Sequence, residues 1–159
     1  MAGEPGHVCA RGQRCRTEYQ ARISGPLMDR IDLRIDVPAV TAADLIKPGV
    51  SEPSAVVAAR VALARACQKQ RFLELGHPGV TANARCPTAL IETIAQPDSG
   101  GAALMRDAAE KLKFSARAYH RILKVARTLA DLDGAETVGR IHIAEAISYR
   151  LSGEVAVAA

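Results

Sequence analysis

The sequence predicts a mainly α-helical fold, with a bundle of about four or five helices from Ser54 to Leu151 preceded by one helix and one strand. Three observations predict it. Apolar residues recur at helical spacing through the second half of the chain, between recognisable start and stop signals. The chain is 48% hydrophobic but only 3% aromatic, so its core must be aliphatic and rich in alanine. A single segment, Ile31–Val37, alternates apolar and polar residues with the period of a strand.

The N-terminal residues 1–15 are expected to be a disordered lead-in, because they are rich in glycine and charge and have no periodicity. His7, Cys9 and Cys15 are weak candidates for metal ligands. A tetrahedral site needs four good ligands, and this region offers neither four nor a CxxC pair. We therefore predict no metal site.

Residues 16–39 are expected to contain a short helix, a turn and the strand. Thr17–Ile23 is predicted to be helical, with Thr17 as the N-cap. Gly25-Pro26 predicts a turn, because proline fixes φ and keeps the preceding residue out of the helical region. The strand Ile31–Val37 follows and buries one face, since a strand buried on both faces would be apolar throughout.

Arg30 lies at the entry to this predicted strand, where its side chain can project beyond the sheet toward a neighbouring molecule. The alternative for Arg30 is an ion pair with Asp29 or Asp32. The residues alone favour the ion pair.

Residues 40–53 contain prolines and a glycine and repeat at neither period, so we expect a linker between two domains. The helical domain is expected to span residues 54–151, followed by a tail, residues 152–159, with no evident role. Ser54 and Ser115 are expected to be N-caps, and Gly76 is expected to follow the end of the first helix. The expected helices are Ser54–Leu75, Pro87–Ala95, Ala102–Leu112, Ser115–Leu132 and Ile141–Leu151.

The predicted helix Ser115–Leu132 carries two stripes, an apolar one that packs and a basic one. The basic stripe consists of Arg117, Arg121, Lys124 and Arg127. Such a stripe is usually only solvated, and the alternative is contact with nucleic acid through Arg65, Arg121, Lys124 and Arg127. Arg117 differs from the others because it lies in the first turn, where the helix dipole and free amides attract anions.

Composition restricts the function classes further. The net charge of +4 and pI of about 9.1 fit a nucleic-acid or nucleotide partner without requiring one. No run of 18 apolar residues and no signal sequence is present, so we expect a cytoplasmic protein without a membrane partner. The cysteines lack the dense spacing of a secreted disulfide scaffold, and we expect free thiols at Cys9, Cys15, Cys67 and Cys86.

Three segments carry a resemblance to a known family. They are ISGPLMDRIDL (Ile23–Leu33), SARAYHRILKVARTLADL (Ser115–Leu132) and HIAEAISYR (His142–Arg150). Together they resemble the C-terminal third of the magnesium-chelatase-like, ComM-type AAA+ ATPases, in the family's order and near its spacing. The resemblance covers roughly residues 19–150. It implies that residues 16–39 are a fragment of the α/β core of the AAA+ ATPase and that residues 54–151 are its helical lid domain.

The resemblance implies roles for two arginines. Arg30 matches the arginine finger, which reaches into the neighbouring subunit's ATP site, and Arg117 matches the sensor-two arginine of the lid, which contacts the γ-phosphate. It also implies ATP and Mg²⁺ as cofactors of the complete family protein, neighbouring subunits in a homo-hexamer as partners, and DNA as the substrate of an ATP-driven branch-migration motor. No GxxxxGK[ST] occurs in this sequence, and the family's Walker A and B segments are expected upstream of Met1. We therefore expect no cofactor and no ATP turnover for this chain alone.

Three functions remain open at this point. The first is the C-terminal portion of a hexameric AAA+ motor that supplies the finger, the sensor and the lid. The second is a free-standing basic helical module that binds DNA. The third is a protomer-contact domain, or a remnant, without activity.

Overall fold

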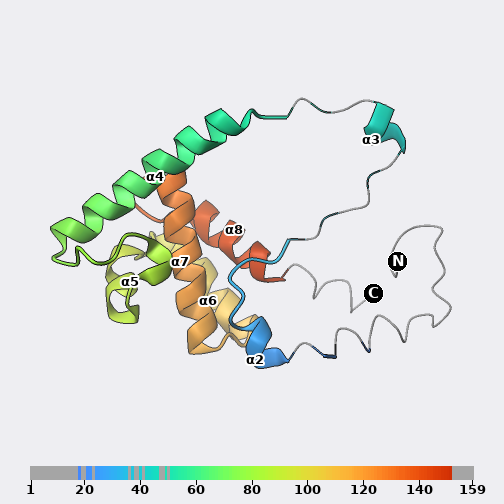
Figure 1. The fold of residues 1–159 in the computed structure, drawn as a ribbon. Helices are drawn as coiled ribbons and strands as arrows, with labels where there is room; N and C mark the ends of the chain where they lie inside the picture. The colour runs from blue at the N-terminus through green and yellow to red at the C-terminus, as the bar shows by residue number, and fades with distance from the viewer. Residues whose placement is uncertain are drawn as a thin grey trace. The chain divides into compact units, whose positions relative to one another are not determined.

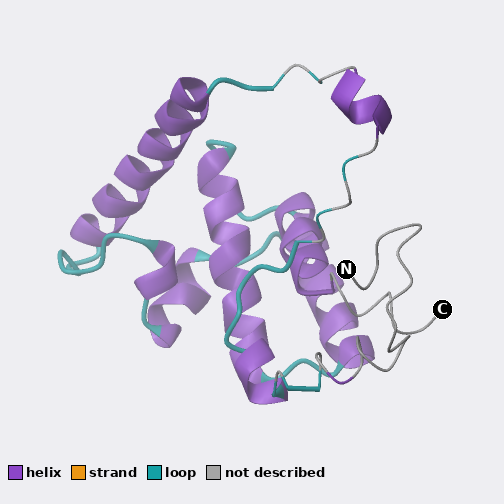
Figure 2. Cartoon of the chain, turned by 45° about the vertical axis from the view of Figure 1, so that its right-hand side comes forward, coloured by secondary structure: helices purple, strands orange, loops and turns teal. Residues whose placement is uncertain are grey.

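The computed structural model describes residues 18, 21–22, 24–35, 37, 40, 42–46, 49 and 51–151. Its described part is helical, with no named strand and a single isolated bridge between Pro97 and Val138 (Figures 1 and 2). The mainly α-helical prediction is therefore confirmed. The helices are α2 (Gly25–Met28), α3 (Ala42–Ile46), α4 (Ser54–Glu74), the 3₁₀ turn η1 (Asn83–Arg85), α5 (Thr88–Ile94), α6 (Ser99–Leu112), α7 (Ala116–Leu132) and α8 (Arg140–Leu151).

The chain divides into two compact units, one of residues 1–31 and 36–49 and one of residues 32–35 and 50–159. In the first unit, the Gly-Pro break begins the short helix α2, where Ser24 O accepts from the amides of Leu27 (3.0 Å) and Met28 (3.1 Å). The expected linker contains the short helix α3. The predicted lead-in, tail and most of the helix Thr17–Ile23 fall outside the described residues.

Helix α7 is the centre of the second unit, because it contacts α4, η1, α5 and α8, while α6 packs against α8 (Figure 1). Ala118 and Ile122 of its predicted apolar stripe are buried, and Ala126 and Ala130 are fully buried where neighbouring elements approach closely. The core is aliphatic, as the composition predicts, apart from Phe72 of α4. Its largest fully buried side chains include Phe72, Ile91, Met105, Ile122, Leu123, Val138 and Ile143.

One predicted N-cap and one predicted helix start are wrong. Ser54 is the first residue of α4, and Pro53 is its N-cap without a side-chain hydrogen bond. Helix α6 begins at Ser99 and not at Ala102, because Asp98 is its N-cap and accepts from the Gly101 amide at 2.6 Å. This cap outweighs the low helix propensity of the two glycines that follow Ser99.

The helix ends predicted after Ser54 agree with the structure to within one residue, and the predicted cap at Ser115 is confirmed. Gly76 follows α4 with a φ of +76°, and the His77 amide donates to Phe72 O at 2.8 Å, which closes the helix. Ser115 is the N-cap of α7, and its Oγ accepts from the Ala118 amide at 3.1 Å. None of the helices within the described ranges has the length and hydropathy needed to cross a membrane.

The strand predicted at Ile31–Val37 is not formed in the described residues. Residues 31–35 are outside any helix or strand, and residues 32–35 belong to the helical unit. The Arg34 amide donates to Tyr149 O at 2.9 Å, while Leu33 and Ile35 are 48% and 68% exposed. A strand needs a neighbouring strand for its backbone groups, and the described part of the chain offers none.

Candidate functional site

The first turn of α7 presents the residue that the sequence singles out. Because Ser115 caps the helix, the chain turns sharply into α7 and Arg117 lies in its first turn, on the surface. Arg117 forms no ion pair with any residue that the structure describes. Its guanidinium is therefore available to an external anion at the positive end of the helix dipole.

Arg117 lines a polar pocket of about 320 Å³, which we call the cationic pocket. Four basic side chains of α7 contribute to its wall, because positions one turn apart lie on the same face of a helix. The pocket is lined by Asp32, Ala84, Thr88, Arg117, His120, Arg121 and Lys124. The fold thus gathers cations from two turns of one helix around a concave surface.

Contacts inside the fold orient three of these side chains. Arg121 forms an ion pair with Asp32. Lys124 Nζ donates to Ala84 O at 3.2 Å. The His120 ring lies 2.7 Å from both Ala116 O, through Nδ1, and a carboxylate oxygen of Glu92, through Nε2. These contacts hold the basic groups at the pocket while leaving each of them partly exposed.

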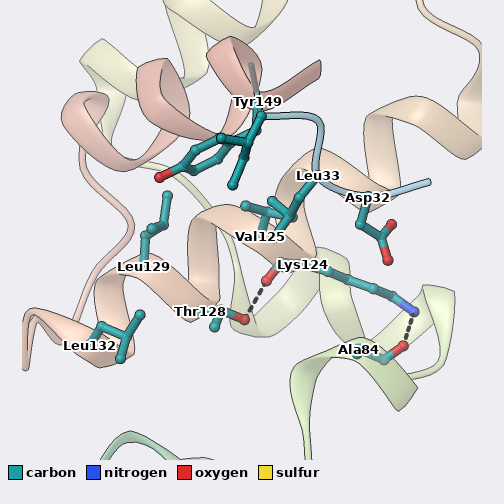
Figure 3. Close-up of a pocket in the computed structure, with 10 residues that line it drawn as sticks. Asp32, Leu33, Ala84, Lys124, Val125, Thr128, Leu129, Leu132 and Tyr149 are labelled. Atoms are coloured by element: carbon teal, nitrogen blue, oxygen red, sulfur yellow. Dashed lines mark hydrogen bonds between the residues drawn. The ribbon is translucent and has the colours of Figure 1, made fainter. Parts of the chain in front are cut away.

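An apolar pocket of about 370 Å³ adjoins the cationic pocket and shares Asp32, Ala84 and Lys124 with it (Figure 3). Its other lining residues are mostly apolar and come from residues 32–35, α7 and α8. They are Leu33, Ile35, Val125, Thr128, Leu129, Leu132 and Tyr149. The two pockets together offer an apolar surface beside a cationic one, a combination that suits a ligand with an apolar part and an anionic part.

Arg127 was predicted to contact nucleic acid, and the structure shows that this prediction is wrong. Its side chain is buried, with 2% of the residue exposed, and it is fully engaged inside the fold. Nε donates to Asp131 at 3.0 Å, and the two terminal nitrogens donate to Glu136 O (2.7 Å) and Ala135 O (2.6 Å). The regular spacing of the basic stripe predicts Arg127 among the exposed arginines, but the chain that leaves α7 folds back over it.

Asp131 is the acceptor at the centre of this buried cluster. Arg71 of α4 forms an ion pair with it, and Asn83 Nδ2 of η1 donates to it at 2.8 Å. Burial alone raises the pKa of Asp131, but hydrogen bonds from Arg71 and Asn83 and the charge of Arg127 outweigh burial and lower it. The hydrogen bond to Asp131 likewise raises the pKa of Arg71. The cluster is a structural tie between α4, η1 and α7.

The other predicted residues are scattered over the molecule. Arg30 is exposed just after α2, and its amide donates to Leu27 O at 2.9 Å. Arg65 is exposed on α4. His7, Cys9 and Cys15 lie outside the described residues, and the described residues contain no group of three or more potential metal ligands. Cys67 and Cys86 are free thiols, as predicted.

Asp32, Thr88 and His120 line the pocket although the sequence did not predict them as members of this site. Asp32 and Thr88 come from segments remote from α7 in the chain, so no local pattern signals them. His120 lies one turn after Arg117, and this spacing is the one feature of the sequence that could have indicated that both residues lie on the same face of the helix.

Comparison with known proteins gives concordant matches. Residues 51–150 match the family model described as magnesium chelatase, subunit ChlI C-terminal, and residues 1–45 match that of magnesium chelatase, subunit ChlI. The chain is 39% identical over 133 residues to competence protein ComM of Haemophilus influenzae, covering 83% of this chain and 25% of ComM. It is 37% identical over 150 residues to the uncharacterized protein YifB of Escherichia coli, covering 91% of this chain and 28% of YifB. The chain thus spans about a quarter of the length of these relatives.

Proposed function

We propose, from the premise that this chain belongs to the magnesium-chelatase-like family that includes ComM and YifB, that it is the C-terminal lid region of an AAA+ ATPase. In this proposal Arg117 is the sensor-two residue, which contacts the terminal phosphate of bound ATP, and Arg30 is the arginine finger. The observation that carries the proposal is the position of Arg117, exposed in the first turn of a capped helix on the wall of the cationic pocket.

The residues of this chain fit one part of an ATP site. The cationic pocket suits phosphate oxygens, because guanidinium and ammonium groups donate charge-assisted hydrogen bonds to them. The described residues contain no cluster of carboxylates that suits Mg²⁺, and the sequence contains no GxxxxGK[ST] loop. The phosphate cradle and the magnesium ligands therefore belong, in this proposal, to another segment of polypeptide.

The two arginines act at different stages of the chemistry. Arg117 holds the terminal phosphate from the lid and so orients it for attack. Arg30 donates a fixed, planar fork of N–H groups to the neighbouring subunit's nucleotide and neutralises charge that develops in the transition state. Removal of such a finger costs on the order of 10³- to 10⁵-fold in rate in other NTPases.

The test uses a polypeptide in which a P-loop domain precedes this chain. Arg30→Ala and Arg117→Ala are each expected to abolish ATP turnover, whereas Arg106→Ala, at an exposed position of α6, is expected to retain it. Mixing Arg30→Ala subunits with P-loop-deficient subunits should restore part of the turnover, because an intact P-loop meets an intact finger where the two kinds of subunit are neighbours. Mixing Arg117→Ala subunits with the same P-loop-deficient subunits should not restore turnover, because the sensor contacts the nucleotide bound to its own subunit.

Wild-type turnover by either single variant would refute the assigned role. Turnover by the 159-residue chain itself would refute the proposed division of the ATP site.

The family resemblance extends the proposal to a homo-hexameric, cytoplasmic motor with DNA as its substrate. Of the four basic residues expected to contact DNA, Arg127 is buried and Arg121 and Lys124 face the cationic pocket. Arg65 is exposed on α4. The geometry therefore favours the ATPase lid over a free-standing DNA-binding module.

A further inference from the structure

The cationic pocket contains a carboxylate of the protein's own. Asp32 forms an ion pair with Arg121, and it is the one acidic residue among the described residues that line the pocket. In Figure 3 the Asp32 carboxylate and the charged end of Lys124 lie on the same side of the pocket. A negatively charged group with acceptor oxygens therefore lies where Arg117, His120, Arg121 and Lys124 converge.

Few contacts hold this carboxylate in place. The described ion pair is partly exposed, with 27% of the Arg121 side chain and 45% of the Asp32 side chain accessible, and an exposed ion pair adds little stability. The neighbouring backbone is tied to α8 by the Arg34 amide, which donates to Tyr149 O at 2.9 Å. Leu33 and Ile35 remain about half or more exposed. Breaking the ion pair between Asp32 and Arg121 therefore costs little.

We propose that the cationic pocket is a phosphate-binding site and that Asp32 occupies it as a competing anion, so that phosphate binding and docking of residues 32–35 exclude each other. This inference rests on the proposed function, because the phosphate meant is that of the nucleotide contacted by Arg117. The pocket is a concave space of about 320 Å³, which favours a compact polyphosphate over an extended DNA backbone.

Asp32 follows Arg30 by two residues. Displacement of Asp32 by a phosphate therefore frees the chain immediately after the proposed finger, Arg30. Nucleotide binding to the lid of one subunit then determines whether Arg30 of that same subunit can reach the neighbouring subunit. Asp32 acts here as a positioning residue and not as a catalytic one.

Binding of inorganic tripolyphosphate to the 159-residue chain tests the proposal by calorimetry. Asp32→Asn removes the competing charge and is expected to tighten binding about two- to fivefold, the range that an exposed ion pair supports. Arg121→Ala is expected to weaken binding by at least as much. The controls, Asp107→Asn and Arg106→Ala, make the same charge changes at exposed positions of α6 and should bind like the wild type.

Hydrogen exchange provides a second measurement, independent of affinity. Saturating tripolyphosphate is expected to accelerate exchange of the Arg34 amide in the wild type, because its bond to Tyr149 O is lost when the segment leaves. In Asp32→Asn the amide should exchange fast before any addition. Melting curves of all variants are expected to coincide, since none of the substituted side chains is buried.

Three results would overturn the proposal. They are an affinity of Asp32→Asn equal to that of Asp107→Asn, unchanged Arg34 exchange at saturation, and binding of a short DNA duplex without binding of tripolyphosphate. Failure of the proposed function looks different. If the Arg117→Ala variant still hydrolyses ATP, the sensor role of Arg117 is refuted. If Asp32→Asn in the same set of experiments binds tripolyphosphate more tightly than the wild type, the phosphate-binding site is still supported.

Discussion

Replacement of Asp131 by alanine is expected to destabilise the helical unit strongly, because it removes the shared acceptor of a buried cluster. The Asp131 side chain is 0% exposed and accepts hydrogen bonds from Arg71, Arg127 and Asn83. Asp131→Ala leaves two guanidinium groups without their common counter-charge. Breaking a buried ion pair by removal of one partner costs about 3–5 kcal/mol.

The structure narrows the expected loss of stability. Arg127 keeps its bonds to the carbonyls of Ala135 and Glu136, and the Arg71 side chain, 20% exposed, can turn toward water. We therefore expect the lower part, about 3–4 kcal/mol. For a domain of this size such a loss lowers Tm on the order of 20 °C.

Thermal and urea unfolding followed by circular dichroism measures this loss. The matched control is Asp133→Ala, two residues along the same helix end, where the carboxylate is 60% exposed and accepts from His142 Nε2 at 3.1 Å. It should cost less than about 1 kcal/mol. A loss below about 1 kcal/mol for Asp131→Ala, equal to that of the control, would refute the argument that this cluster ties α4 and η1 to α7.

Two further predictions concern pH and packing. Because the pKa of Asp131 is lowered in the folded state, its contribution to stability is present above the unfolded value of about 3.9 and is lost as pH falls toward the folded value. The stability difference between wild type and Asp131→Ala should thus stay constant from pH 7 to about 5 and shrink below pH 4 in urea titrations, and a difference that grows in acid would contradict this sign. Gly101→Ala is expected to cost about 1 kcal/mol net, because its Cβ would lie 3.0 Å from Pro97 Cβ, 3.1 Å from Asp98 Oδ1 and 3.3 Å from Ile143 Cγ1. Gly100→Ala, whose nearest neighbours are 3.6 Å away, should be neutral or stabilising in the same melts, and equal stability of the two variants would argue against close packing at Gly101.

Local sequence patterns were sufficient to predict the helical class and most helix ends. Apolar residues at helical spacing predict α7 and α8 closely, because a helix buries one stripe and its period is visible in the residues themselves. Capping is also local, and Ser115 was predicted correctly as the cap of α7. The start of α6 was missed because the glycines after Asp98 suggest a break, and only the cap geometry overrides them.

Tertiary structure alone decided which basic residues are exposed and what completes the pocket. In the sequence, Arg117 and Arg127 are equivalent members of one basic stripe. In the structure, the chain after α7 buries Arg127 against Asp131 and leaves Arg117 exposed. The alternation at residues 31–37 likewise predicts a strand, but strand pairing needs a neighbour from elsewhere in the chain, and residues 32–35 instead place Asp32 beside Arg121. Helical period is a property of neighbours in sequence, whereas burial and charge pairing depend on residues that only folding brings together.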